Sequence, residues 1–343
     1  MVVTLMAALL EPGGLSLQPA YSSRFPLQHE DVDGLQRAVG GADGWVVTRA
    51  PPLGLNALFV LHHHVNHPSN AGLVGHLVDA AADRGPHFTR FLRLLSTSMF
   101  DASVYEDRGA VAAGAYGTVR RWARGDTMHA AKLLSLPEHA TDRCPLATLL
   151  TEVAVMEACG DVPGVATMHD YGVTDAGYAL VMELCECDLA AWRAGRGALT
   201  PEDVPLYLKV FRGVAAALDA VHARGAIHFD VKPQNVLLRG GKPLTPDTDT
   251  EAVGARIAVA DFGESVFEPS VPAGASRPTL SRGTPSIMSP ELLVDVHHDR
   301  RRPKGASSAA DVWSLGCTLF EVLTGRPLFE DDPESFTRIT SGG

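Results

Sequence analysis

The chain reads Ile227-His228-Phe229-Asp230-Val231-Lys232-Pro233-Gln234-Asn235-Val236-Leu237-Leu238 in its second half. An acid, a base and an amide here share a short polar loop that leads into an apolar strand. Asp230 could accept a proton from a hydroxyl group, and Lys232 could neutralise a phosphate. Asn235 could hold a metal ion through its amide oxygen. Taken alone, the stretch could also be a turn with polar caps.

A second polar signal follows a short apolar strand predicted over residues 257–260. The strand ends in Asp261-Phe262-Gly263. A carboxylate at a strand end beside a flexible glycine suits Mg²⁺, which prefers one or two carboxylates together with phosphate oxygens. The joint occurrence of this motif and the 227–238 stretch, in this order, favours a phosphate-transfer site over two unrelated turns.

Upstream, a glycine-containing turn runs over residues 112–119 between two predicted strands. Gly114 and Gly117 would let backbone amides approach phosphate oxygens without obstruction by a Cβ atom. A tight hairpin is an equally good interpretation of this turn alone. Lys132 lies in the next apolar strand, where its charge needs an anion, and Glu152 on the following helix is a candidate. The alternative is a lysine at a strand edge that extends to water.

The hydrophobic pattern predicts a β-rich part followed by an α-rich part, and therefore an α+β fold of two lobes. The predicted strands are 111–122, 129–136 and 178–184, and the predicted helices are 88–99, 146–158, 204–224 and 309–323. Residues 239–254 are rich in Gly, Pro, Thr and Asp and are predicted to form a loop without apolar periodicity.

Residues 1–103 form a separate N-terminal segment of unknown role. The segment is rich in Gly, Pro and His, with several histidines between His62 and His76. A metal site there is disfavoured because the histidines lack a clear ligand spacing, and Cys185-Glu186-Cys187 likewise lacks a matching pair.

Composition narrows the class of protein. The chain has 343 residues, of which 45% are apolar and 20% charged, as in an ordinary globular protein. A formal net charge of −11 argues against a nucleic-acid partner. No apolar run reaches the roughly 18 residues of a membrane span, so no membrane partner is expected. Five cysteines, an odd number, favour a reducing intracellular compartment, cytoplasmic or nuclear.

Taken together, these motifs resemble those of the eukaryotic-type protein kinases, of serine/threonine type. The resemblance covers about two thirds of the chain, residues 104–343, with an N-lobe at 104–183 and a C-lobe at 188–343. Beyond the motifs already described, it rests on Ser289-Pro290-Glu291 and on Asp311-Val312-Trp313-Ser314-Leu315-Gly316, whose aspartate braces the catalytic loop in the family.

The resemblance implies ATP and Mg²⁺ as cofactors and proteins with Ser or Thr acceptors as partners. Asp230, Lys232 and Asn235 would be catalytic, and Asn235 and Asp261 would hold the metal. The oligomeric state is not predicted. The residues expected to contact the nucleotide or to support its phosphates are Ala112, Gly114, Gly117, Val119, Ala130, Lys132, Glu152, Met182, Glu183, Cys185, Asp188, Leu237 and Asp261.

The sequence departs from the family pattern in several places. Asn235 and Asp261 are 26 positions apart, which is longer than is usual for the family, and the excess falls in residues 239–254. Ala112 replaces the first glycine of the loop, and Phe229 replaces the arginine that usually precedes the catalytic aspartate. In the family that arginine pairs with a phosphorylated activation segment, so activity is expected not to need phosphorylation at Ser276, Thr279, Ser281 or Thr284. The chain also ends soon after Phe329, which predicts a shortened C-lobe without the last helices. Either the chain is truncated, or residues 1–103 cover the face that those helices would cover.

Three functions remain in competition. The first is an active serine/threonine protein kinase, which the presence of Lys132, Glu152, Asp230, Asn235 and Asp261 favours. The second is a pseudokinase or ATP-binding scaffold, suggested by the short C-lobe. The third, a small-molecule phosphotransferase, is disfavoured by the peptide-docking type of activation segment. His228-Phe229-Asp230 also resembles kinases of large DNA viruses, which would place the protein in an infected host cell.

Overall fold

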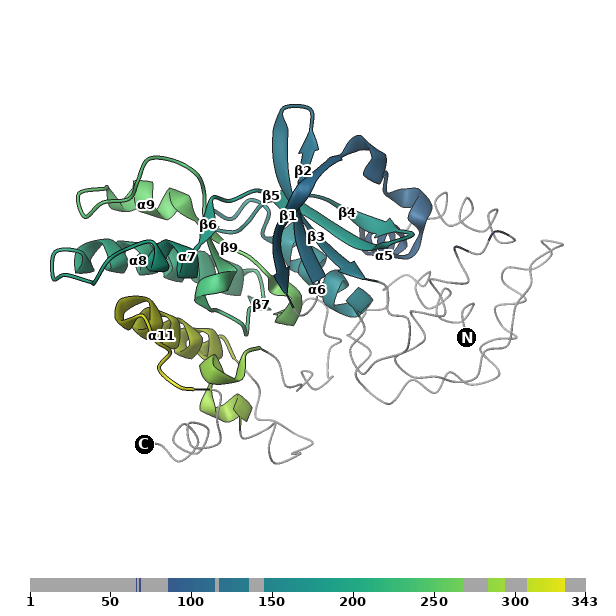
Figure 1. Ribbon diagram of the computed structural model, residues 1–343. Coiled ribbons are helices and arrows are strands. Elements are labelled where there is room, and N and C mark those ends of the chain that lie inside the picture. The colour runs from purple at the N-terminus through teal and green to yellow at the C-terminus, as the bar shows by residue number, and fades with distance from the viewer. Residues whose placement is uncertain are drawn as a thin grey trace. The chain divides into compact units, whose positions relative to one another are not determined.

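The computed structural model of the 343-residue chain describes residues 66, 68, 86–114, 117–135, 145–267, 283–293 and 307–330. The chain divides into two compact units. The first unit comprises Met1–Leu150 and His169–Met182, and the second comprises Thr151–Met168 and Glu183–Gly343. Figure 1 labels their helices and strands.

The first unit is built on a five-stranded sheet with the strand order β1-β2-β3-β5-β4, in which β1 and β2, and β2 and β3, pair antiparallel. Its strands are β1 (Glu106–Gly114), β2 (Gly117–Arg124), β3 (Thr127–Ser135), β4 (Met168–Thr174) and β5 (Gly177–Glu183). One predicted strand at 111–122 is in fact a hairpin of β1 and β2, because the chain reverses between Gly114 and Gly117, which pair across the turn. β4 was not predicted, since its pattern of burial does not alternate.

Helix α5 (Pro86–Leu95) precedes this sheet and is fastened to β4. Arg93 donates to the Tyr171 carbonyl at 2.9 Å, pairs with the Asp170 carboxylate and stacks over the Tyr171 ring. The sequence predicted a helix over 88–99. It ends at Leu95 because Ser96 is extended and caps the short 3-10 helix η2 (Thr97–Met99). A second 3-10 helix, η3 (Ala102–Val104), leads into β1.

The second unit is largely helical. Its long helices are α8 (Val204–Ala223) and α11 (Ala309–Thr324), with the shorter α7 (Leu189–Ala194), and α6 (Pro145–Ala158) begins in the first unit. Apolar residues at helical spacing, among them Val210, Val214 and Leu218, give α8 a buried face. Helices α6, α8 and α11 agree with the helices predicted over 146–158, 204–224 and 309–323, whereas α7 was not predicted. The fold is thus α+β, with a β-rich part and an α-rich part.

Two small antiparallel sheets carry the polar loops of the second unit. Strands β6 (Cys187–Asp188), β8 (Val236–Leu238) and β9 (Ile257–Val259) form one, and β7 (Ala226–Ile227) pairs with β10 (Val266–Phe267) in the other. Three 3-10 helices lie at the loops: η4 (Pro233–Asn235), η5 (Phe262–Glu264) and η7 (Pro285–Ile287). Strands of the two sheets therefore lie at the ends of the loops that contain Asp230 and Asp261.

The prediction of an aperiodic loop over 239–254 was wrong at its C-terminal end. Residues 250–256 form helix α9 (Thr250–Arg256), which lies along α8 in Figure 1. Asp249 caps the helix by accepting from the Glu251 N–H at 3.0 Å, and Val253 is fully buried. A helix this short is marginal alone, so packing and the cap stabilise what the residue pattern could not predict. Among the described residues, every helix is too short or too polar to span a bilayer.

Candidate active site

The loop after β7 presents its polar side chains at one point. Backbone pairing fixes both of its ends, since Ile227 pairs with Val266 and Val236 pairs with Val259. Pro233 starts the 3-10 turn η4, in which the Asn235 N–H donates to the Lys232 carbonyl at 3.0 Å. A proline suits this first position because it needs no N–H there. The turn brings Asn235 back toward Asp230.

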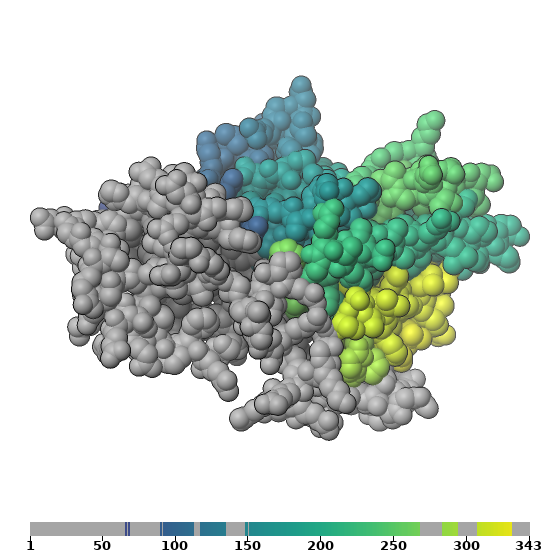
Figure 2. All heavy atoms as spheres, turned by 180° about the vertical axis from the view of Figure 1, so that it is seen from behind, coloured from purple at the N-terminus to yellow at the C-terminus, as the bar shows by residue number. Residues whose placement is uncertain are grey.

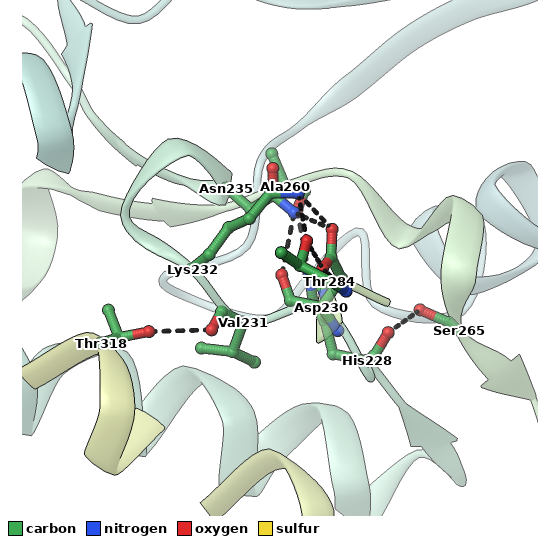
Figure 3. Close-up of polar contacts among 9 residues, drawn as sticks. All are labelled: His228, Asp230, Val231, Lys232, Asn235, Ala260, Ser265, Thr284 and Thr318. Atoms are coloured by element: carbon green, nitrogen blue, oxygen red, sulfur yellow. Dashed lines mark hydrogen bonds and ion pairs between the residues drawn. The ribbon is translucent and has the colours of Figure 1, made fainter. Parts of the chain in front are cut away.

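Both oxygens of Asp230 are held by neighbouring side chains (Figure 3). Oδ2 accepts from Asn235 Nδ2 at 3.0 Å and pairs with Lys232 Nζ at 2.7 Å. Oδ1 accepts from Thr284 Oγ1 at 2.7 Å and from the Thr284 N–H at 2.9 Å. Asp230 is 5% exposed, so the carboxylate has one orientation and is compensated by a lysine and several donors.

Asp311 of α11 supports the loop through hydrogen bonds to its backbone. Its carboxylate is fully buried and accepts from the His228 N–H at 2.8 Å and the Phe229 N–H at 2.7 Å. His222 of α8 adds a third bond, from Nε2 at 2.7 Å. Phe229 has a positive φ of 64°, a strained value for a bulky residue. The two backbone bonds to Asp311 hold the loop in this conformation.

His228 connects the loop to the strand that ends at Asp261. Its Nδ1 accepts from the Asp230 N–H at 3.2 Å, and its Nε2 lies 3.0 Å from the Ala260 carbonyl. Because Nδ1 is the acceptor, the proton is on Nε2, which donates to Ala260. The imidazole thus ties the backbone of Asp230 to the residue before Asp261.

Asn235 and Asp261 are the candidate magnesium ligands, and the structure brings their strands together. The Ala260 N–H donates to the Asn235 carbonyl at 3.0 Å, and Asp261 follows at once with a left-handed φ of 64°. The amide nitrogen of Asn235 is used by Asp230, so its amide oxygen is the atom that would bind. One amide oxygen and one carboxylate, completed by phosphate and water oxygens, fit Mg²⁺.

Gly283 explains how Thr284 reaches Asp230. A Cβ atom on Gly283 would lie 2.2 Å from the Phe229 carbonyl oxygen, and its φ is +87°. Only glycine allows this close approach of the two backbones. Thr284 then also accepts from Lys232 Nζ at 2.9 Å. The contact between Thr284 and Asp230 was not predicted, because the sequence indicated Thr284 as a phosphorylation candidate and, with Gly283, as a feature typical of serine/threonine kinases.

The predicted residues of the glycine turn and the lysine strand lie on β1, β2 and β3. Ala112 pairs with Val119, and Val119 pairs with Lys132, so these three share neighbouring strand positions. A Cβ atom on Gly117 would lie 2.1 Å from the Leu133 carbonyl oxygen, so close packing on β3 requires glycine there. Gly114 ends β1, and Ala130 is buried on β3.

The other predicted nucleotide residues lie mainly in the second unit. Glu152 is fully buried on α6, and Met182, at the end of the first unit, is buried on β5. Asp188 pairs with Leu237 between β6 and β8, and it caps α7 by accepting from the Ala191 N–H at 2.7 Å. Burial raises the pKa of Cys185 to about 12, so this thiol stays protonated and is a poor metal ligand.

Comparison with known proteins identifies the family. The family model of the protein kinase domain matches residues 105–341. The chain belongs to the eukaryotic-type serine/threonine protein kinases. It is 34% identical over 308 residues to a probable serine/threonine-protein kinase of Dictyostelium discoideum, covering 84% of this chain and 12% of that protein.

Two further relatives are named kinases. Identity is 34% over 195 residues to CBL-interacting protein kinase 20 of Oryza sativa subsp. japonica, covering 56% of this chain and 38% of that protein. It is 31% over 241 residues to calcium/calmodulin-dependent protein kinase type 1B of Rattus norvegicus, covering 69% of this chain and 62% of that protein. The kinase chain thus spans less than two thirds of the length of each of these relatives.

Thr284 gives the first testable prediction for this kinase. Replacing it by valine keeps the shape but removes the hydroxyl that bonds Asp230 Oδ1 and Lys232 Nζ. We expect kcat to fall about tenfold, because losing the oriented hydrogen bond from the hydroxyl to the Asp230 carboxylate costs about 1.5 kcal/mol. Steady-state kinetics with Thr284→Ser as the matched control checks this. A valine variant as active as the serine variant would contradict the assigned contact.

Proposed function

We propose that this kinase transfers the γ-phosphate of ATP, with Mg²⁺, to Ser and Thr hydroxyl groups of protein substrates. The observation that carries the proposal is the carboxylate of Asp230, buried and bonded by Lys232, Asn235 and Thr284. Such an orientation leaves one group placed to accept the proton of an incoming hydroxyl, which is what phosphate transfer needs from a base.

Each side chain then has a role that follows from its chemistry. Asp230 orients the acceptor hydroxyl and takes its proton, and Lys232 places a positive charge beside the transferred phosphate. Asn235 and Asp261 would hold Mg²⁺, which when bound neutralises the charge of the phosphate oxygens. Thr284 keeps Asp230 and Lys232 in register through its hydroxyl.

We further propose roles for the residues predicted to bind the nucleotide. Lys132 would bind the α- and β-phosphates with Glu152 as its partner, and backbone groups of Glu183 and Cys185 would bind adenine, with Asp188 near the ribose. The apolar surroundings of the base and the phosphate-binding turn would come from Ala112, Gly114, Gly117, Val119, Ala130, Met182 and Leu237.

The alternative, a pseudokinase or ATP-binding scaffold, keeps the fold and the nucleotide but not the transfer. The test is incubation with γ-labelled ATP, Mg²⁺ and a generic protein substrate, followed by measurement of label in the substrate. Our proposal predicts label that disappears when EDTA removes Mg²⁺. Thermal stabilisation by ATP and Mg²⁺ without any label in the substrate would support the scaffold instead.

Phe229 leads to a prediction about regulation. Its side chain is 4% exposed and packs in an apolar cluster with Ile227, Val266 and Ala310. A buried phenylalanine offers no charge for a phosphate to neutralise, so phosphorylation of the activation segment gains nothing there. We expect a triple alanine variant at Ser276, Thr279 and Ser281, which lie outside the described residues, to keep kcat within about twofold.

Measurement of that kcat on protein treated with phosphatase and on untreated protein checks the prediction. Thr284 is left unchanged in this variant, because its hydroxyl contacts Asp230 directly and its loss would lower activity for another reason. Full loss of activity in the triple alanine variant, with the fold intact by circular dichroism, would overturn the prediction.

A further inference from the structure

The segment between β8 and β9 begins and ends at an arginine. Arg239 follows β8 directly, and Arg256 closes α9. We call residues 239–256 the β8–β9 insertion. It is fastened to α8, since Lys209 Nζ donates to the Pro246 carbonyl at 2.7 Å. The insertion is therefore held in place on the second unit. Residues that bind its two arginines are held in place with it.

Arg239 binds Glu183 with both arms of its guanidinium group. Nε lies 2.8 Å from Glu183 Oε2, and Nη2 lies 2.8 Å from Glu183 Oε1. The remaining N–H groups donate to the carbonyls of Val165 at 2.9 Å, Ile257 at 2.6 Å and Ala255 at 3.3 Å. The paired side chains are 27% and 19% exposed, so solvent screens this bidentate pair less than a surface pair.

Glu183 is the last residue of β5, and we call residues 183–188, which run from it to the end of β6, the hinge segment. Its carboxylate also accepts from the Thr167 N–H at 2.8 Å, and its own N–H donates to the Thr167 carbonyl at 2.9 Å. Burial alone would raise the pKa of Glu183, but the bonds from Arg239 and Thr167 hold it below its usual value. The carboxylate is therefore charged at neutral pH.

Arg256 binds the other glutamate of the hinge segment. Its Nη2 lies 3.0 Å from Glu186 Oε2, and its Nη1 donates to the Lys242 carbonyl at 2.7 Å. The Glu186 N–H donates to the Leu238 carbonyl at 2.9 Å. Glu186 is 56% exposed at its side chain, so this second pair contributes less than the first. Two arginines of the insertion thus bind two glutamates of the hinge segment.

We propose that Arg239 is a positioning residue that sets the shape of the hinge segment and thereby the affinity for ATP, with Arg256 as a secondary support. The inference rests on the proposed function, in which backbone groups of Glu183 and Cys185 bind adenine. All five N–H groups of Arg239 are accounted for by Glu183 and backbone carbonyls. Its loss should therefore weaken nucleotide binding and leave the chemistry around Asp230 unchanged.

The test compares two arginine-to-lysine variants of the full chain. Arg239→Lys keeps the charge but loses the fork that holds Glu183 in two directions. Arg224→Lys is the matched control, because Arg224 also binds a carboxylate bidentately, Asp161 at 2.6 and 3.0 Å, away from the hinge segment. The Kd for ATP with Mg²⁺ is measured by calorimetry, and KM and kcat by label transfer.

We expect Arg239→Lys to raise both the Kd and the KM for ATP about fivefold to tenfold, with kcat within about twofold of the wild type. Arg224→Lys should leave the three constants within about twofold. Glu183→Gln removes the same ion pair from the other side and should raise Kd to a similar extent. The double variant should then add little, since both single changes break one interaction.

Equal effects of the two lysine variants on Kd, or a fall in kcat at unchanged Kd, would overturn the positioning role. If Arg239→Lys does not fold by circular dichroism, an unchanged Kd in Glu183→Gln would overturn it instead. Failure of the proposed function is seen separately. If the wild-type chain binds ATP but transfers no phosphate, the proposed kinase activity is overturned. The comparison of Kd values then still decides the role of Arg239. A wild-type chain that binds no ATP would overturn both.

Discussion

Replacing Asp230 by asparagine is expected to lower phosphate transfer about a thousandfold while the Kd for ATP stays within about twofold of the wild type. Asparagine fits the same space but cannot take a proton from a hydroxyl. It also leaves Lys232, 2.7 Å from the carboxylate, without its counter-charge. The loss therefore falls on the chemical step, and single-turnover transfer measured at saturating ATP reports it directly.

The matched control is Asp175→Asn, an aspartate exposed in the turn between β4 and β5. It should transfer phosphate at the wild-type rate. An Asp230→Asn variant that kept more than about a tenth of the wild-type rate would mean that another group accepts the proton. An equal loss in both variants would point to a general effect of charge.

The largest effect on stability is expected at Asp311. Asp311→Asn replaces one of the two acceptor oxygens by an NH₂ group, which then faces either the Phe229 N–H, now bonded to Oδ1, or the His228 N–H, now bonded to Oδ2. A buried donor left without an acceptor costs about 1–3 kcal/mol, so we expect the free energy of unfolding of the second unit to fall by about 3 kcal/mol. Denaturant unfolding followed by circular dichroism measures this change.

The same substitution should also lower kcat, because the strained backbone of Phe229, at φ 64°, loses one of the bonds that hold it. Asp219→Asn is the control, since Asp219 is exposed on α8 in the same unit. If the two variants unfolded at the same denaturant concentration, Asp311 would not be the support that its contacts indicate.

Much of the candidate site was predictable because its residues lie close together in sequence. Asp230, Lys232 and Asn235 are brought together by one 3-10 turn, and Pro233 already indicates such a turn. Asp261 was predictable because a short apolar strand ends there. For these residues the local pattern, together with the joint occurrence of the two motifs, indicated the cluster, and their catalytic roles stay a prediction.

Other contacts depend on tertiary structure and leave no local signal. Thr284 reaches Asp230 only because Gly283 passes within contact distance of the Phe229 backbone. Arg239 and Glu183 are 56 residues apart and share no periodic pattern. Helix α9 is only seven residues long and contains Gly254, so it would be marginal alone, and its packing on α8 stabilises it. Figure 2 shows α11 beside the 283–293 segment. There the Ser314 hydroxyl donates to the Ile287 carbonyl at 2.8 Å, a further contact between residues far apart in sequence.

Analysis of the phosphorylated amino acid in a protein substrate labelled with γ-labelled ATP and Mg²⁺ tests the proposed function most directly. The wild-type chain and Asp230→Asn are labelled side by side, and the substrate is hydrolysed to amino acids. We predict phosphoserine and phosphothreonine from the wild type and almost none from the variant. If the wild-type chain bound the labelled ATP but left no phosphorylated residue in the protein substrate, this result would contradict the proposal that the chain is an active serine/threonine kinase.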